Sequence, residues 1–289
     1  MPVATHFGPR PVTTPRTNYD NFVVRPVATC VGAEIPGVDL SAPISTELQA
    51  DLHRALLDWK VIFFRDQTIT AEQHRDFARL WGELEVHPFL PAGDIPEVVA
   101  FAKDDVTRGV ENIWHSDVTW RQAPSLGSIL RALEVPPLGG DTLWTDMAAA
   151  YEGLPDAVRD RIDGLTAVHD FAGSFGQAMS TADLAKMQAQ YPPAEHPVVR
   201  THPETGQRAI YVNEIFTSHI VGLDPAESDE LLHLLCAQAR IPEYQCRFRW
   251  KPGSVAFWDN RSTQHYAVSD YWPARRVMER VTIVGDVPA

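Results

Sequence analysis

The sequence predicts a mainly β protein in which helices flank a β-sandwich or barrel. From about residue 98 onward, short apolar or alternating runs recur between Pro and Gly residues, which is typical of many short strands joined by turns. Longer stretches with apolar residues at helical spacing stand before and between these runs. Together the two patterns favour a β core with helices packed outside it.

The first third of the chain predicts two helices around one buried strand. Residues 46–60 have apolar side chains on one helical face, and Thr46–Gln49 reads as a capping box at their start. The apolar run Val61–Phe64 follows as a buried strand. A second capping box, Thr70–Gln73, opens a helix that ends at Gly82.

The rest of the chain predicts strands interrupted by two helices, near residues 146–163 and 225–240. Because no repeat or linker divides it, we expect a single domain over residues 26–289, preceded by a flexible arm rich in Pro and Thr over residues 1–25. The expected strands are Val98–Phe101, Ile113–Trp120, Ser128–Val135, Val198–Thr201, Ala209–Val212, Tyr244–Trp250, Ser254–Trp258 and Arg276–Val284.

Charge and composition exclude several classes of protein. The chain has 25 Lys and Arg against 38 Asp and Glu, a formal net charge of −13, which argues against non-specific binding to nucleic acid or anionic membranes. No apolar run approaches the roughly 18 residues of a membrane span, and the N-terminus lacks the apolar region of a secretory signal. Three cysteines without a CxxC pair suit a reducing compartment, so we expect a cytoplasmic protein.

The pattern His-x-Asp occurs twice, and local geometry separates the two copies. His74 and Asp76 lie in a predicted helix, where residues two apart point about 200° away from each other. His115 and Asp117 lie in a predicted strand, where residues two apart share a face and can bind one ion. His265 follows another apolar strand and is our third candidate ligand. Two His and one carboxylate with open positions are typical of non-haem Fe(II) oxygenases.

The last predicted strand carries two arginines on one face. Alternation places Arg276 and Arg280 together, while Val and Ile side chains occupy the opposite face. An edge strand with solvated arginines would have the same pattern. Beside a metal triad, however, two sites for organic anions explain it better, because the planar guanidinium matches carboxylates, sulfonates and phosphates.

Long motifs in order then resemble the taurine dioxygenase family of Fe(II)/2-oxoglutarate-dependent dioxygenases. They are WHSDVTW at 114–120, GGDTLW at 139–144, HPVVRTHPETG at 196–206, WDNRSTQHYA at 258–267 and the segment Arg275–Gly285. The resemblance runs from about Val27 to the C-terminus. It implies a double-stranded β-helix, or jelly-roll, core that uses Fe(II), 2-oxoglutarate and O₂. It also implies a homo-oligomer, either a dimer or a tetramer, that acts on a small organic anion.

The resemblance also assigns roles to residues. His115, Asp117 and His265 match the iron ligands of the catalytic centre, and Thr142 and Arg276 match the residues that hold the distal carboxylate of 2-oxoglutarate. Seven positions match or occupy the substrate pocket: Arg280 and His87, which would bind a sulfonate, and Val118, Ser174, Phe175, Glu111 and Leu90.

Two of these positions depart from the family pattern and leave taurine itself open. Leu90 stands where the family has a Tyr near the substrate amine, and Glu111 stands where it has an Asn. We therefore expect hydroxylation of taurine or a related alkylsulfonate, with release of sulfite, an aldehyde, succinate and CO₂. An alkyl sulfate or an aryloxyalkanoate would also suit Arg280.

Two other classes of function compete with an oxygenase. A Zn-dependent hydrolase could use the same triad, but no obvious general base stands near either ligand motif. A non-catalytic anion-binding barrel would leave the triad unexplained. Composition and position further suggest that Pro91–Gly109 and Gly173–Tyr191 are lid loops near the pocket.

Overall fold

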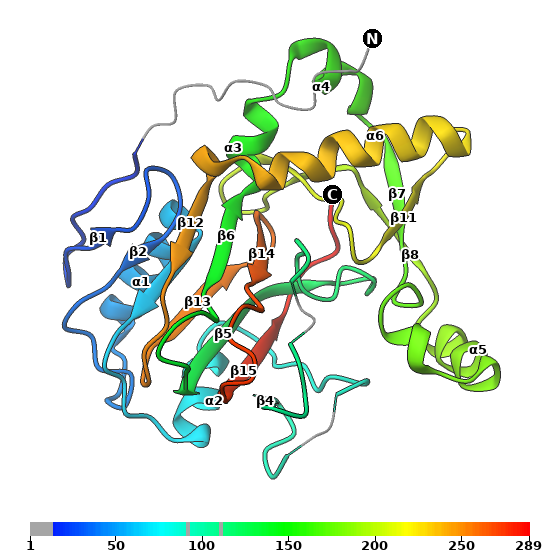
Figure 1. The fold of residues 1–289 in the computed structure, drawn as a ribbon. Helices are drawn as coiled ribbons and strands as arrows, with labels where there is room; N and C mark the ends of the chain where they lie inside the picture. Colours follow the sequence, from blue (N-terminus) through cyan, green and yellow to red (C-terminus); the bar gives the residue numbers. More distant parts are fainter. Residues whose placement is uncertain (1–13, 91–92, 110–111) are drawn as a thin grey trace.

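Two facing sheets, antiparallel except where β2 (Ala33–Glu34) pairs with β3 (Val61–Phe64), form the centre of the protein (Figure 1). The computed structural model describes residues 14–90, 93–109 and 112–289. The large sheet contains, in spatial order, β1 (Arg25–Pro26), β2 (Ala33–Glu34), β3 (Val61–Phe64), β13 (Val255–Asp259), β5 (Ser125–Glu134), β15 (Arg276–Val284) and β4 (Val98–Lys103). The small sheet contains β12 (Gln245–Phe248), β6 (Thr142–Asp146) and β14 (Thr263–Ala267).

Within the described residues, two minor sheets and six α-helices surround this pair. The minor sheets are β11 (Thr217–Ile220), β7 (Thr166–His169) and β8 (Ala194–Pro197), and β10 (Arg208–Ile210) with β9 (Val199–Thr201). The helices are α1 (Thr46–Trp59), α2 (Ala71–Arg79), α3 (Met147–Glu152), α4 (Asp156–Ile162), α5 (Thr181–Gln190) and α6 (Pro225–Ala237), with 3-10 turns η1 (Phe175–Ala178), η2 (Gln238–Arg240) and η3 (Pro242–Tyr244). The mainly β class is confirmed, but no described sheet closes on itself, so the barrel alternative is wrong.

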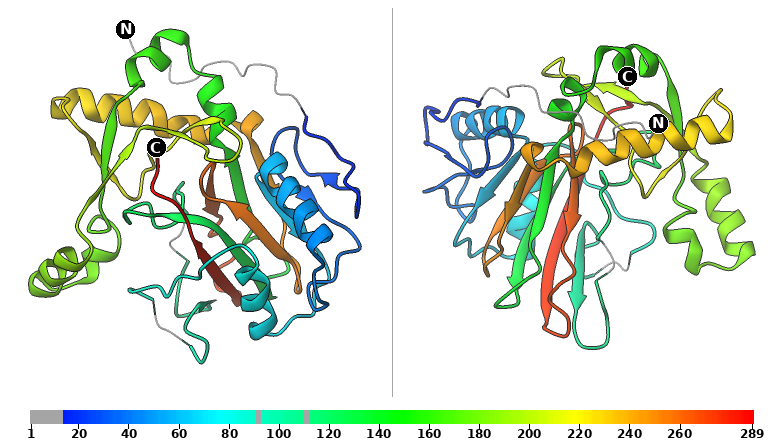
Figure 2. Two further views of the ribbon diagram at one scale, coloured as in Figure 1. Left: turned by 180° about the vertical axis from the view of Figure 1, so that it is seen from behind. Right: turned by 45° about the horizontal axis from the view of Figure 1, so that its top comes forward.

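Alternation along the strands divides the core into layers. In β3 and β13, Phe64 and Phe257 point outward to a cluster that includes Trp59 of α1 and Phe77 of α2. Their neighbours point inward to the space between the sheets, where Phe63 meets Phe248 and Trp144 of the small sheet. Figure 2 shows α1 and α2 against the outer face of the large sheet and α6 across the end of the sheets.

The structure confirms one of the two predicted capping boxes and contradicts the other. Thr70–Gln73 is a capping box, as predicted, because each side chain accepts from the backbone N–H of the other residue. The box at Thr46–Gln49 is wrong: the N-cap is Ser45, whose hydroxyl accepts from the N–H of Leu48 at 3.2 Å. The helix predicted at 146–163 is two helices, because Pro155 fixes its own φ and lacks an N–H group.

The segments predicted as a flexible arm and as lid loops contain hydrogen-bonded structure. Residues 14–25 are not a free arm, because Tyr19 donates to Asp58 and Trp59 donates to the carbonyl of Arg16. The rest of that arm lies outside the described residues. The segment Gly173–Tyr191 contains η1 and α5 rather than only a loop, and Pro91–Gly109 contains β4. None of the helices in the described part of the chain could span a membrane.

Candidate metal centre

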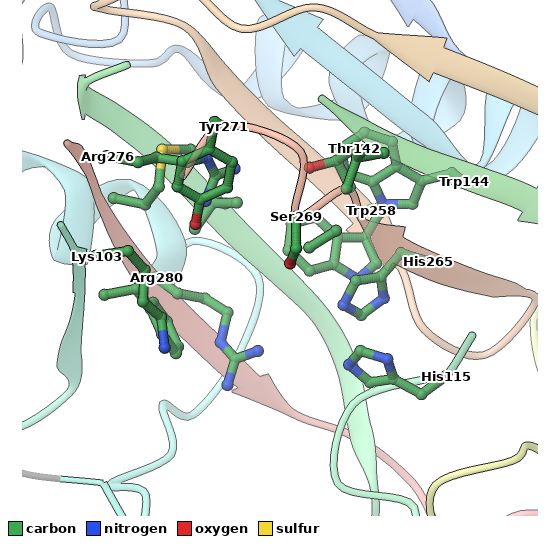
Figure 3. Close-up of a pocket in the computed structure, with 15 residues that line it drawn as sticks. Lys103, His115, Thr142, Trp144, Trp258, His265, Ser269, Tyr271, Arg276 and Arg280 are labelled. Atoms are coloured by element: carbon green, nitrogen blue, oxygen red, sulfur yellow. The ribbon is translucent and has the colours of Figure 1, made fainter. Parts of the chain in front are cut away.

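Three side chains converge at one end of the space between the sheets. The ligand atoms of His115, Asp117 and His265 all lie within 4.8 Å of one another. His265 belongs to β14, and an antiparallel β-bridge joins its backbone to that of His115. The His115 N–H donates to the His265 carbonyl at 3.1 Å, and the His265 N–H donates to the His115 carbonyl at 2.8 Å. This bridge sets the two imidazoles side by side, with ring centroids 4.2 Å apart (Figure 3).

The convergence is as predicted, but its cause is different. The expected strand Ile113–Trp120 is wrong, because the chain makes only the bridge at His115 and then turns over residues 117–120. Val118 has a left-handed φ of 47°, and the side-chain oxygen of Asn260 accepts from the Asp117 N–H at 3.1 Å. Asp117 therefore lies close to His115 because of a tight turn, which Asn260, the residue after β13, holds in place. The two residues do not share the face of a strand.

The Asp117 carboxylate is held ionised in a buried site. Ser128 donates to Oδ2 at 2.7 Å, and Arg280 donates to Oδ1 at 2.6 Å. Burial by itself would raise the pKa of Asp117, but the positive charge of Arg280 and the hydrogen bond from Ser128 outweigh it and hold this pKa well below its usual value. The carboxylate thus stays charged, as a ligand of a divalent cation must.

The two histidines are also prepared as ligands. Burial, reinforced by His115, lowers the pKa of His265 to about 3, so its imidazole is neutral. Nδ1 of His115 lies 2.8 Å from the carbonyl oxygen of Ile113, which only accepts, so Nδ1 carries a hydrogen and the ring would bind a metal through Nε2. Two imidazoles and one ionised carboxylate fit Fe(II), which this donor set commonly binds.

A cavity beside the triad is lined by cations on one side. Arg276 and Arg280 enter it from β15, opposite His115 and His265 (Figure 3). The outward face of β15, with Val281 and Ile283, packs in the core under the helices. The alternation predicted for this strand is therefore confirmed. The other lining residues are Phe101, Lys103, Leu130, Thr142, Trp144, Trp258, Ala267, Val268, Ser269, Tyr271 and Met278.

Arg276 lies deep in this cavity, near Thr142. Arg276 is only 8% exposed, and its guanidinium carbon stands 5.7 Å from the ring centre of Tyr271. The Thr142 hydroxyl accepts from the indole N–H of Trp250 at 2.9 Å, so its own hydrogen remains available for a ligand. Both residues predicted to bind 2-oxoglutarate therefore line one cavity with His115 and His265 of the triad.

The Gly139-Gly140 pair explains how the backbone approaches Arg276. Gly140 has a φ of 69°, and its N–H donates to Asp270 at 2.8 Å. A Cβ at Gly140 would stand 3.2 Å from Cδ and Nε of Arg276. Glycine is therefore required here both by backbone conformation and by space.

We expect Gly140→Ala to lower the free energy of unfolding by about 2 kcal/mol or more, because the left-handed penalty alone is about 1–2 kcal/mol. Gly37→Ala is the matched control, since Gly37 has a φ of 79° with no described atom within 4 Å of its Cβ. Denaturant unfolding of both variants measures the difference. Equal losses would mean that Arg276 does not crowd this position.

A second group of predicted residues lies in an aromatic cluster next to the centre. The buried members are Val118, Trp120, Phe171 and Phe216, and the half-buried ones include Phe89, Phe175, Met179, Leu184, Met187, Tyr191 and Ile215. His87 contacts this cluster, with its ring centre 5.4 Å from that of Phe175. Burial, together with the nearby charge of Arg280, lowers the pKa of His87 to about 3.

The remaining predicted residues are placed less closely. The Ser174 hydroxyl donates to the carbonyl of Phe171 at 3.1 Å, at the edge of the aromatic cluster. Leu90 is half-buried after His87, with no contact that assigns it a role. Glu111 lies outside the described residues.

Sequence reasoning missed residues that support the centre. Ser128 and Asn260 hold Asp117, and Lys103 lines the cavity opposite Arg276 in the β4–β15 register. Asn260 stood in the WDNR motif and could have been noticed there. Ser128 and Lys103 carried no signal, because only the pairing of strands places them beside the site.

Comparison with known proteins agrees with this geometry. The family model described as "Taurine catabolism dioxygenase TauD, TfdA family" matches residues 23–282. The chain is 40% identical over 273 residues to an alpha-ketoglutarate-dependent sulfate ester dioxygenase of Pseudomonas putida, covering 92% of this chain and 90% of the relative. It is 37% identical over 265 residues to an alkylsulfatase of Acinetobacter baylyi, covering 89% and 83%.

A solved structure extends the likeness to three dimensions. A taurine dioxygenase from Burkholderia xenovorans matches with a TM-score of 0.80 and 41% identity, covering 93% of this chain and 92% of that one. The enzyme class predicted from the motifs is confirmed, whereas the hydrolase and the non-catalytic barrel receive no support. The chain belongs to the TauD/TfdA family of 2-oxoglutarate-dependent dioxygenases, which use Fe(II), 2-oxoglutarate and O₂.

Proposed function

We propose that this dioxygenase hydroxylates an alkyl sulfate ester at the carbon attached to the ester oxygen. The observation that carries the proposal is the position of Arg280. Its guanidinium donates to the Asp117 carboxylate, and its charge acts on the imidazole of His87, which contacts the aromatic cluster. A sulfate held by Arg280 would place its alkyl chain against apolar side chains and its first carbon near the metal centre.

Each residue has a defined part in the proposed reaction. His115, Asp117 and His265 would hold Fe(II), which together with 2-oxoglutarate and O₂ supplies the oxidant for a C–H bond. Arg276 and Thr142 would hold the distal carboxylate of 2-oxoglutarate. Arg280 and His87 would bind the sulfate and so select which carbon is hydroxylated.

The products follow from the bond that becomes unstable. Hydroxylation leaves one carbon bearing both a hydroxyl and a sulfate ester, and this carbon loses sulfate as the hydroxyl proton leaves and the C=O bond forms. One O₂, one 2-oxoglutarate and one alkyl sulfate thus give sulfate, an aldehyde, succinate and CO₂. The printed names of the Pseudomonas putida and Acinetobacter baylyi relatives support this substrate class.

An alkylsulfonate such as taurine is the second candidate, favoured by the likeness to the Burkholderia xenovorans structure. The same hydroxylation would then release sulfite. The half-buried Leu90, which offers no polar contact for an amine, weighs against taurine itself. An aryloxyalkanoate would also place an anion on Arg280, but it would bring no sulfur product.

A matched panel tests the substrate. We expect hexyl sulfate to be consumed with a kcat/KM at least about 100-fold above that of taurine, because each buried CH₂ contributes about 0.8 kcal/mol and no ammonium is desolvated. Sulfate, sulfite and succinate are measured for hexyl sulfate, hexanesulfonate, taurine and 2,4-dichlorophenoxyacetate. Sulfite release as the main sulfur product would favour the second candidate, and turnover of the aryloxy acid alone would contradict both.

We also infer that residues 26–289 form one catalytic domain with a jelly-roll core. The two facing sheets share one inner cluster, and the family match extends over residues 23–282, which supports this organisation. The homo-oligomer, dimer or tetramer, and the cytoplasmic location stay predictions from the sequence. Light scattering of the purified protein would test the oligomer.

A further inference from the structure

The turn that carries Asp117 has a strained backbone. Val118 adopts a φ of 47°, a left-handed conformation that a β-branched residue rarely takes. The N–H of Arg121 donates to the Val118 carbonyl at 3.0 Å and closes the turn. Strain of this kind persists only where surrounding contacts hold the backbone in place.

The next residue, Thr119, is fully buried and held through its hydroxyl. Oγ1 of Thr119 accepts from the side-chain amide of Asn213 at 3.0 Å and lies 2.9 Å from Nδ1 of His169. The amide cannot be reversed, because Oδ1 of Asn213 accepts from the backbone N–H groups of Ile215 and Phe216. Its NH₂ group must therefore face Thr119.

His196 holds the backbone of the same turn. Its Nε2 lies 2.9 Å from the carbonyl oxygen of Thr119 and 2.9 Å from that of Arg121. Carbonyls only accept, so Nε2 carries the proton and donates to both. His196 on β8 and His169 on β7 are neighbours in one minor sheet, with ring centres 5.2 Å apart. The side chain of His196 comes from HPVVRTHPETG, a motif to which the proposed function assigns no role.

We propose that Thr119, His169, His196 and Asn213 form a turn clamp, a set of positioning residues that keeps Val118 in its left-handed conformation and thereby aims the Asp117 carboxylate at the metal. The proposal rests on the metal centre of the proposed function, not on the identity of the substrate. Each of the four clamp residues is at most 1% exposed. They act through the turn and are not catalytic residues.

Thr119→Val tests the clamp, because it removes the hydroxyl and keeps the shape of the side chain. We expect the affinity for Co(II), followed by visible absorption of the metal-free protein titrated with the ion, to fall about 10-fold, as when an outer-shell partner of a metal ligand is lost. Thr119→Ser, which keeps the hydroxyl, should stay within about threefold of the wild type. Ser228→Ala is the matched control, because Ser228 of α6 would lose the buried hydrogen bond that it accepts from the N–H of Ile220 in β11, which should lower Tm without changing Co(II) affinity.

A rescue variant separates positioning from general stability. Glycine takes a positive φ without strain, so adding Val118→Gly to Thr119→Val should recover most of the lost Co(II) affinity. Turnover is not the readout, because Val118 belongs to the aromatic cluster. Should Thr119→Val not fold, His169→Phe removes one of the two bonds to the hydroxyl and should show a smaller loss with the same rescue.

The outcomes distinguish the clamp from the metal centre. Wild-type protein that does not bind Co(II) would overturn the metal centre and the clamp together. Normal binding by both the wild type and Thr119→Val, with only Tm lowered, would overturn the clamp alone. A loss of affinity that Val118→Gly does not rescue would also overturn it, because the effect would not pass through the turn.

Discussion

Asp117→Ala is expected to abolish turnover and to weaken Fe(II) binding by more than about 100-fold, because loss of a ligand exceeds the effect of losing its outer partners. Asp117 supplies the negative charge of the triad and is held in place by Ser128 and Arg280. Equilibrium dialysis of Fe(II) without oxygen, together with succinate formation, measures both effects. Iron binding equal to that of the wild type would contradict the assignment of this ligand.

The same substitution has a second consequence for stability. Arg280 has a side chain only 12% exposed and would keep its charge without the Asp117 carboxylate. Breaking a buried pair by removal of one partner costs about 3–5 kcal/mol. The double variant Asp117→Ala with Arg280→Met should therefore recover much of the free energy of unfolding while iron binding stays lost. If the double variant did not recover stability, the loss of iron binding would reflect damage to the fold.

Arg276→Ala is expected to weaken binding of 2-oxoglutarate about 10- to 100-fold, because hydrogen bonds to a charged group contribute about 1.5–3 kcal/mol each. Arg276 is buried and lines the same cavity as Thr142, so water screens its guanidinium little. Titration of 2-oxoglutarate into the Fe(II) protein without oxygen, followed by the visible absorption of the chelate, measures the affinity. Arg276→Lys should recover only part of it, since an ammonium cannot make two parallel bonds.

Arg280→Ala is the matched control on the same face of β15. It should leave 2-oxoglutarate affinity nearly unchanged and raise the KM for hexyl sulfate by at least about 10-fold, which corresponds to one lost charged hydrogen bond. The two arginines are four residues apart on one strand, so a general defect of β15 would affect both ligands in both variants. If both substitutions weakened only the sulfate, the assignment of the two arginines would be wrong.

Much of the site was predictable because its signals are local. The alternation along Arg276–Val284 places both arginines on one face, and that face lines the cavity in the structure. His115, Asp117 and His265 carry the donor types of an Fe(II) site in motifs that resemble a known family. His115 and Asp117 do converge with His265, but the geometric reason for expecting this was incorrect, since the segment is a turn and not a strand.

Other features depend on residues far apart in the chain. The bond between Arg280 and Asp117 spans 163 positions, and that between Asn260 and the Asp117 N–H spans 143. Lys103 faces the cavity only because β4 pairs with β15 in one register. The residue pattern around Lys103 does not predict that this side chain lines the cavity.

By itself, then, the sequence determined the candidate ligand set, the arginine face and the mainly β class, because side-chain chemistry and a period of two residues are properties of short segments. The tertiary structure decided how Asp117 is aimed, which groups keep it ionised and which residues clamp its strained turn. These depend on sheet register and on contacts between distant segments, whose free energy exists only once the chain has folded.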